Sequence, residues 1–163
     1  MLARLRSSQP PAQGADVITR AMGALALIAL AVVHVVDLPA TLGPIPLVGI
    51  GYFGIIVASL GVAVALIARS HWLAWAAGAS VAVSAMGGYI LTRALPGGFL
   101  GDHGDVGNWR CPLGIAALSV ESVIILLVLL VTAGAWQARI HAASVAAQHR
   151  PAARRAPEYS QPR

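Results

Sequence analysis

Four long stretches of this chain carry hydrophobic side chains at nearly every position and very few charges. The hydrophobic residues surround the whole helix rather than one face, for example over 55–68 and 124–133, which is typical of helices that face lipid. About 20 residues of α-helix cross a bilayer core about 30 Å thick. The pattern therefore predicts four membrane-spanning helices, at 18–38, 47–68, 72–95 and 113–136.

The segments outside these helices are short. Pro39 and the Pro and Gly residues that follow it predict a loop before the second helix. The connection 69–71 is so short that the second and third helices must be antiparallel neighbours. We expect a disordered tail at 1–17, a loop at 96–112 and an Arg-containing tail at 137–163. The predicted fold class is all-α, an integral membrane four-helix bundle with up-down-up-down topology.

The composition agrees with this prediction. Of the 163 residues, 58% are hydrophobic and 10% are charged, and the mean hydropathy is +0.76. A soluble domain has about 25% charged residues. The sequence therefore excludes a soluble enzyme, a disordered chain and a nucleic-acid binder, and makes the lipid bilayer the first partner.

The distribution of arginines predicts the orientation, because cytoplasmic flanks retain positive charge. With the N-terminus inside, nine of the 11 basic residues lie on the cytoplasmic side, and only Arg93 and Arg110 lie outside. We expect a multi-pass protein of the cytoplasmic (inner) membrane with both termini in the cytoplasm. Aromatic residues at the two interfaces are expected to act as anchors: Trp72, Trp75 and Trp136 on the inner side, and Trp109 on the outer side.

A cleaved signal peptide is an alternative interpretation of the first helix. Arg4 and Arg6 precede the apolar run, as in signal peptides, but 38–40 lacks the small residues of a cleavage site.

The predicted helices are expected to pack against one another through small residues. The spacing of small residues every fourth position predicts these packing faces: Ser80, Ser84 and Gly88 in the third helix, and Gly54, Ala58, Gly61 and Ala65 in the second.

Ionisable groups at membrane depth are costly, about 2.5 to 3.5 kcal/mol at the centre of a helix. Glu121 lies near the middle of the last helix, where it either fixes the register of the bundle or serves as a proton or cation site. Four further polar residues lie towards the outer ends of their helices. If they face inward, they form one outward-facing polar pocket with Glu121: His34, Tyr52, Tyr89 and Arg93. Arg93 is expected either to pair with Glu121 or to extend to the outer surface.

The loop 96–112 is the one long irregular segment, and such loops are often functional. Oxygen and nitrogen donors in and near it match no defined metal motif, but they allow a divalent metal site formed by His34, Asp37, Asp102, His103 and Asp105. Asp beside Gly also simply forms turns. No cofactor is predicted, because haem ligation by two histidines would need a second His at the depth of His34. Cys111 is the only cysteine, so no internal disulfide can form.

Several short motifs resemble those of a widespread group of uncharacterised small bacterial membrane proteins. They are Tyr89-Ile90-Leu91-Thr92-Arg93, Leu95-Pro96-Gly97, Gly107-Asn108-Trp109 and Pro112-Leu113-Gly114. The resemblance covers about 31–126, and the matching positions are His34, Arg93, Pro96, Pro112 and Glu121. The chain departs from the group at Thr92, where Ser is usual, and at Cys111, where an acidic residue is usual. The resemblance implies the same polar pocket without implying an activity.

Three classes of function follow from these features. We expect a non-enzymatic accessory or interaction subunit, which packs against a protein partner or forms a homo-oligomer, because no catalytic motif is present and small-residue faces are frequent. The alternative is a small transporter, or a protein that handles a metal or protons, with Glu121 and His34 as the binding groups. The third class is an intramembrane enzyme acting through His34, Arg93 and Glu121.

Overall fold

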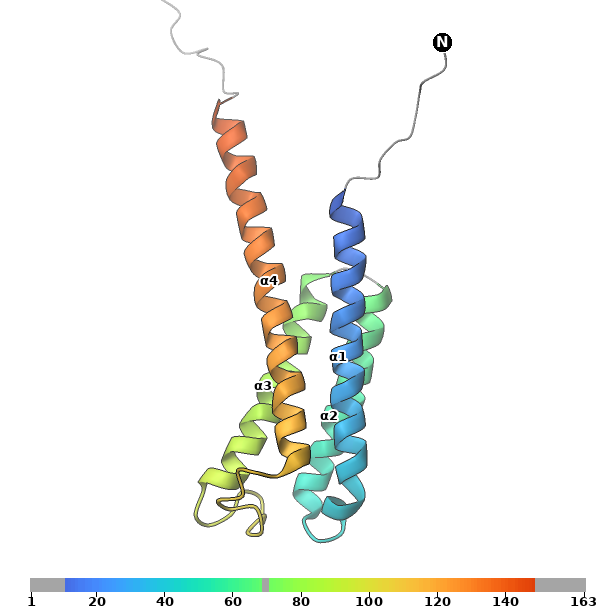
Figure 1. The fold of residues 1–163 in the computed structure, drawn as a ribbon, viewed down its shortest axis with the longest axis vertical. Helices are drawn as coiled ribbons and strands as arrows, with labels where there is room; N and C mark the ends of the chain where they lie inside the picture. The colour runs from blue at the N-terminus through green and yellow to red at the C-terminus, as the bar shows by residue number, and fades with distance from the viewer. Residues whose placement is uncertain (1–10, 69–70, 149–163) are drawn as a thin grey trace, which may run out of the picture. The chain divides into compact units, whose positions relative to one another are not determined.

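The computed structural model describes residues 11–68 and 71–148, and the described residues form four α-helices and their connections (Figure 1). The helices are α1 (Pro11–Leu42), α2 (Pro46–Ala68), α3 (Trp72–Ala94) and α4 (Pro112–Gln148). Each contains a segment long and apolar enough to cross a membrane. The predicted all-α fold class is confirmed, and the chain is a multi-pass membrane protein for which a lipid bilayer is the natural surrounding.

The chain divides into two units, which meet within α4 after Val128. In the first unit α1, α2, α3 and the first half of α4 alternate in direction (Figure 1). The α1–α2 connection and the α3–α4 loop consequently lie at one end, which we call the loop end. Helix α1 packs along α2, and α2 contacts α3, so the predicted antiparallel pairing of the second and third helices is confirmed. The second unit is the remainder of α4.

The first helix is longer than predicted at both ends. It begins at Pro11, because Pro at the first helical position has a suitable φ and needs no N–H partner. It also continues past Pro39 to Leu42, although Pro39 cannot donate a hydrogen bond to the turn before it. The Thr41 hydroxyl donates to the Asp37 carbonyl at 3.0 Å and so supports this last turn. The prediction that Pro39 begins a loop was wrong.

Helix α4 also extends beyond the predicted end at 136 and reaches Gln148. Its last turns are rich in Ala and Gln, which favour helix even without tertiary packing. The predicted tails 1–17 and 137–163 are therefore helical where the structure describes them, from Pro11 and up to Gln148. Their outer parts, 1–10 and 149–163, lie outside the described residues, as do Arg69 and most of the arginines used to predict the orientation.

All four helices meet around Gly78 of α3. A Cβ atom at Gly78 would lie 3.6 to 4.0 Å from side chains of α1, α2 and α4, namely Leu27, Val62 and Ile124. This is ordinary van der Waals contact, which in lipid is the main force that holds helices together. A polar contact also joins α1 to α2. Arg20 donates from Nε to the Leu66 carbonyl at 2.8 Å, which satisfies a carbonyl of the last turn of α2.

Trp75 was predicted to be an interfacial anchor, and the structure corrects this. Its side chain is only 6% exposed and lies over Gly23 of α1, where a Cβ atom would be 2.9 Å from the indole ring. Gly23 lacks a side chain, so it leaves space between the helices that the indole fills. Trp72, three residues earlier in α3, is 70% exposed and remains available to lipid headgroups.

The predicted small-residue faces are not those that pack within the bundle. Gly54 and Gly61 of α2 have open space beside them, and Ser80 and Ser84 of α3 are exposed. The packed face of α3 contains Gly78, Ala82 and Ala85 instead. Small residues recur on several faces of these helices, so larger neighbours such as Trp75 decide which face turns inward.

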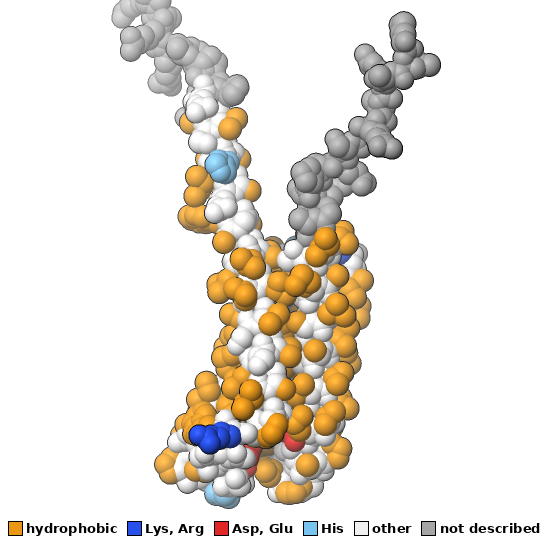
Figure 2. All heavy atoms as spheres, in the orientation of Figure 1, with side chains coloured by type: hydrophobic (Ala, Val, Ile, Leu, Met, Phe, Trp, Pro, Cys, Tyr) orange, Lys and Arg blue, Asp and Glu red, His pale blue; other side chains and the backbone are white. Residues whose placement is uncertain are grey.

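Large hydrophobic side chains cover the outside of the bundle. Figure 2 shows them over the visible face of the first unit, with the charged side chains in view near its ends. Leu25, Phe53 and Val64 are between 60% and 66% exposed. A soluble monomer rarely exposes so large an apolar surface, so lipid is the solvent that fits it.

Candidate functional site

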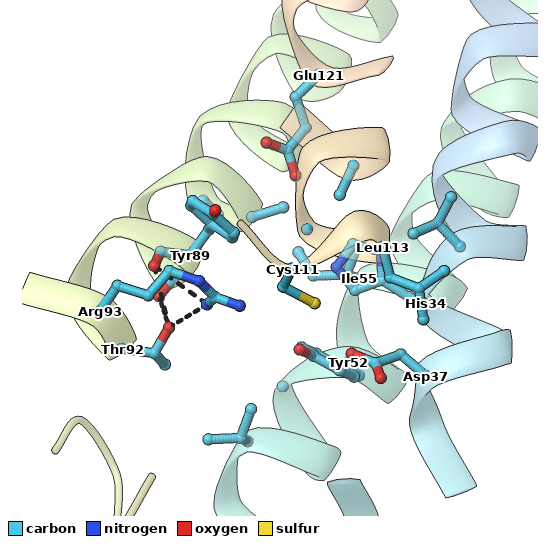
Figure 3. Close-up of a pocket in the computed structure, with 18 of the residues that line it drawn as sticks. His34, Asp37, Tyr52, Ile55, Tyr89, Thr92, Arg93, Cys111, Leu113 and Glu121 are labelled. Atoms are coloured by element: carbon cyan, nitrogen blue, oxygen red, sulfur yellow. Dashed lines mark hydrogen bonds between the residues drawn. The ribbon is translucent and has the colours of Figure 1, made fainter. Parts of the chain in front are cut away.

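A cavity of about 280 Å³ lies in the first unit towards its loop end, and we call it the polar cavity. It is lined by all five residues from which the sequence predicted a pocket: His34, Tyr52, Tyr89, Arg93 and Glu121 (Figure 3). Asp37, Ser84, Thr92 and Cys111 add further polar groups, and the remaining walls are mostly apolar. Each of the four helices and the α3–α4 loop thus contributes to one site.

Among the polar residues labelled in Figure 3, Glu121 lies furthest from the α3–α4 loop. It belongs to the inward face of α4, with Ala117 and Ile124, and is only 1% exposed. Its Oε2 atom is buried and has no hydrogen-bond partner within the described part of the chain. Such an atom costs free energy unless something else satisfies it. The free carboxylate oxygen therefore marks the deep end of the cavity as a place for a ligand atom.

His34 is held by its own helix. Its Nδ1 atom lies 2.9 Å from the Leu30 carbonyl oxygen, and since a carbonyl only accepts, Nδ1 carries the hydrogen. In the neutral ring Nε2 is then an acceptor. The ring stands edge-on to Tyr52 of α2, with centroids 4.9 Å apart and planes at 84°. This contact fixes the orientation of the imidazole against the neighbouring helix.

Asp37 lies one turn beyond His34 along α1, next to Tyr52 (Figure 3). The cavity therefore has a second carboxylate, which lies closer to the α3–α4 loop than Glu121 does. The sequence analysis assigned Asp37 only to a metal site, and it is in fact a cavity residue.

Arg93 does not pair with Glu121, and it does not extend to the surface. Its guanidinium donates from Nη2 to the Asp105 carboxylate at 3.0 Å, and its side chain is 5% exposed. It also donates from Nε to the Asn108 carbonyl at 3.0 Å and from Nη1 to the Thr92 hydroxyl at 2.8 Å. The loop returns over the end of α3, so it brings these acceptors to Arg93. Both predicted positions of Arg93 were therefore wrong.

Tyr89 joins α3, the loop and α4. Its hydroxyl donates to the Trp109 carbonyl at 3.0 Å, and the Arg93 guanidinium carbon lies 3.8 Å from the centre of its ring. Gly114, in the first turn of α4, has no side chain because the Tyr89 ring occupies that space. The Pro112–Gly114 motif was visible in the sequence, but nothing in it indicated that the glycine receives a tyrosine ring.

The α3–α4 loop forms one wall of the cavity through Phe99 and Leu100. Its backbone is tied to α3 by the Gly107 amide, which donates to the Arg93 carbonyl at 3.0 Å. Within the loop, the buried Asp102 carboxylate accepts from the Asp105 amide at 3.1 Å. Burial raises the pKa of Asp102 above its usual value, and this effect is larger than the opposing effect of the hydrogen bond from the Asp105 amide.

The structure does not bring together the five donors from which a metal site was predicted. Only His34 and Asp37 line the cavity, whereas Asp102 and Asp105 make the loop contacts above and His103 is exposed. Among the described residues, no three His, Cys, Asp or Glu side chains lie close enough to share a metal ion. The turn-forming role of Asp102, which the sequence left open, is the one the structure supports.

Sequence reasoning missed several residues of the cavity: Ser84, Thr92, Phe99 and Cys111. Thr92 precedes Arg93 in the motif that ends α3, so its position beside the guanidinium was within reach of the sequence. For Cys111 the sequence predicted only that it forms no internal disulfide. Its place in the cavity wall depends on the path of the loop, for which the sequence carries no periodic signal.

Comparisons with protein-family models, curated proteins and solved structures found no match to this chain. They identify no family, so the resemblance drawn from the short motifs remains a prediction. The four apolar helices and the geometry of the polar cavity are the basis for assigning a function.

Proposed function

We propose that this protein is a non-enzymatic subunit of the cytoplasmic membrane that binds a small ligand in the polar cavity and assembles with a protein partner or a second copy. One observation carries the proposal: the buried Glu121 Oε2 atom has no partner in the described chain and faces a cavity of about 280 Å³. If Glu121 served only to fix the register of the helices, another group of the protein would donate a hydrogen bond to this oxygen. We propose that the ligand makes this contact instead.

Binding without catalysis fits the engagement of the other polar groups. His34 is tied to the Leu30 carbonyl through Nδ1, and Arg93 is held by Asp105, Asn108 and Thr92. These contacts fix the cavity wall, which favours binding because little has to be ordered when the ligand enters. Because of these contacts, Arg93 has no pair of N–H groups free to bind a reacting anion.

An accessory role fits the face of α2 that the bundle leaves open. Gly54 and Gly61 would allow the backbone of another helix to approach α2 closely. Replacing each of them with Leu is expected to weaken a homo-oligomer or a partner complex purified in mild detergent. Gly87→Leu is the matched control, because Gly87 on α3 also has open space beside it. Equal assembly of all three variants, measured by native mass spectrometry, would count against this face.

The proposed orientation places both termini in the cytoplasm and opens the cavity outward, as nine of the 11 basic residues favour. Cys111, the single cysteine, gives a direct test. A membrane-impermeant maleimide is expected to label Cys111 in intact cells. The matched variant, Cys111→Ser with Ser144→Cys in the last part of α4, is expected to react only after the cells are permeabilised. The opposite pattern would reverse the orientation.

A small transporter of protons or cations is the second candidate. It is favoured by the presence of two titratable groups, His34 and Glu121, along one cavity. Glu121→Gln distinguishes the candidates. A subunit is expected to keep its assembly state with this change, whereas a transporter is expected to lose cation uptake into proteoliposomes that the wild-type protein supports.

A further inference from the structure

We infer that the ligand of the polar cavity is a compact organic amine in its protonated form, with the ammonium group against the Glu121 carboxylate and an apolar body along the cavity wall. This inference rests on the proposed binding function. It deepens that function by giving the ligand a charge, a size and an orientation.

The charges of the cavity favour a cation. Arg93 is the only Lys or Arg among the described residues that line it, and the Asp105 carboxylate already neutralises Arg93 at 3.0 Å. No other Lys or Arg of the cavity wall faces Asp37 or Glu121. A buried carboxylate without a counter-charge is costly, and an ammonium group supplies both the charge and the hydrogen-bond donors that Oε2 lacks.

The walls of the cavity favour an organic rather than an inorganic cation. A metal ion would need several His, Cys, Asp or Glu donors in reach of one another, and the described residues provide no such group. The walls are instead formed by apolar side chains, including Val33, Ile55 and Leu113, together with aromatic rings. Tyrosine rings attract an ammonium group through their faces.

The volume of the cavity sets the size of the body. A cavity of about 150 Å³ lined by apolar side chains is known to hold one benzene molecule. The polar cavity, at about 280 Å³, therefore accommodates one ring or a short branched chain with an amino group. Since Glu121 lies further from the α3–α4 loop than Asp37 (Figure 3), the ammonium group lies at the inner end of the cavity and the apolar body extends towards the loop.

Three probes with the same ring and different charges test the inference on the full chain in detergent. At neutral pH benzylamine is a cation, benzyl alcohol is neutral and benzoate is an anion. Benzylamine is expected to raise the Tm of the wild-type protein saturably and to slow maleimide labelling of Cys111, which lies in the cavity wall. Benzyl alcohol and benzoate are expected to bind at least about tenfold more weakly than benzylamine.

Glu121→Gln is expected to weaken benzylamine binding by about tenfold or more, because it removes the counter-charge and keeps the shape. Asp16→Asn is the charge-matched control, because Asp16 lies in α1 away from the cavity and pairs with Arg20. Should Glu121→Gln fail to fold, Gly88→Leu replaces it as the test. Gly88 lines the cavity with open space beside it, so the leucine fills the cavity while Glu121 remains.

Equal binding of benzylamine and benzyl alcohol would overturn the inference, as would full benzylamine binding by folded Glu121→Gln or Gly88→Leu protein. These failures differ from a failure of the proposed function. If the alcohol or benzoate binds as well as benzylamine and Gly88→Leu blocks that binding, the cavity binds ligands and only the amine assignment is wrong. If none of the three probes changes the Tm or the labelling rate, the amine assignment fails, and the assembly experiments on Gly54 and Gly61 decide the subunit role separately.

Discussion

Arg93 of α3 and Asp105 of the α3–α4 loop form an ion pair, with Nη2 and Oδ2 3.0 Å apart, in which the arginine is buried and the aspartate is 31% exposed. The two residues are twelve positions apart, and the pair holds the loop against the end of the helix. The same loop supplies Phe99 and Leu100 to the polar cavity. The wall of the cavity therefore depends on an ion pair that itself does not contact Glu121.

Replacing Arg93 with Ala is expected to release the loop. The change removes the ion pair with Asp105, the donation to the Asn108 carbonyl and the contact over the Tyr89 ring. We expect a loss of about 2 kcal/mol in the free energy of unfolding, below the range for a fully buried pair because the aspartate can rehydrate. Proteolysis within the loop should accelerate accordingly. Arg110→Ala removes an exposed arginine of the same loop, and equal proteolysis of the two variants would contradict the prediction.

Asp102 is expected to make the loop more stable in acid than at neutral pH. Burial raises the pKa of its carboxyl above the usual 3.8, so the folded loop favours the protonated form. The resulting stability is full below the pKa of the unfolded chain and is lost as the pH rises through the raised pKa. Hydrogen exchange of the loop amides should therefore become faster, relative to Asp102→Asn, as the pH rises from about 4 to about 7. A difference between the two proteins that does not change with pH would disprove this.

Gly114→Ala is expected to disturb the cavity although it adds only one methyl group. The new Cβ would overlap the Tyr89 ring, whose hydroxyl is bonded to the Trp109 carbonyl. Overpacking of this kind costs about 1 to 3 kcal/mol. Gly54→Ala serves as the control because open space lies beside Gly54, and it should be neutral or slightly stabilising. Thermal unfolding in detergent measures both, and equal Tm values would show that Tyr89 moves freely.

Trp75 and Trp72 form a second matched pair. Trp75→Ala empties the space beside Gly23 in the packed interior, and we expect a loss of about 3 to 5 kcal/mol in unfolding free energy. Trp72→Ala removes a side chain that is 70% exposed and should change the unfolding free energy by less than about 1 kcal/mol. The comparison is made by reversible unfolding in mixed detergent micelles. Similar losses would indicate that Trp75 does not pack as described.

The existence and packing order of the helices were predictable because they follow from hydropathy and connection length. Long apolar stretches have no alternative to spanning a membrane, and a connection as short as 69–71 forces an antiparallel neighbour. The comparable depth of His34, Tyr52 and Glu121 follows from the same facts, and these residues line one cavity because each of them also faces inward.

The partners of individual side chains were not predictable. Arg93 meets Asp105 rather than Glu121 because the irregular loop folds back over α3, and irregular segments have no period to read. The inward rotation of α3 was also hidden, because the fit of Trp75 onto Gly23 of another helix determines it. Pro39 was predicted to begin a loop. A proline close to the end of a helix removes one hydrogen bond, but the chain can still complete its last turn.

The contacts that hold the α3–α4 loop have a consequence for how the cavity forms. Two hydrogen bonds, from Tyr89 to Trp109 and from Arg93 to Asn108, join positions no more than 20 residues apart. This side of the cavity is therefore formed by one continuous stretch of the chain. The opposite side, with His34 and Tyr52, belongs to the α1–α2 hairpin, which is synthesised first. Glu121 comes from α4, which follows the loop in the chain, so the polar cavity is complete only when α4 joins the other three helices.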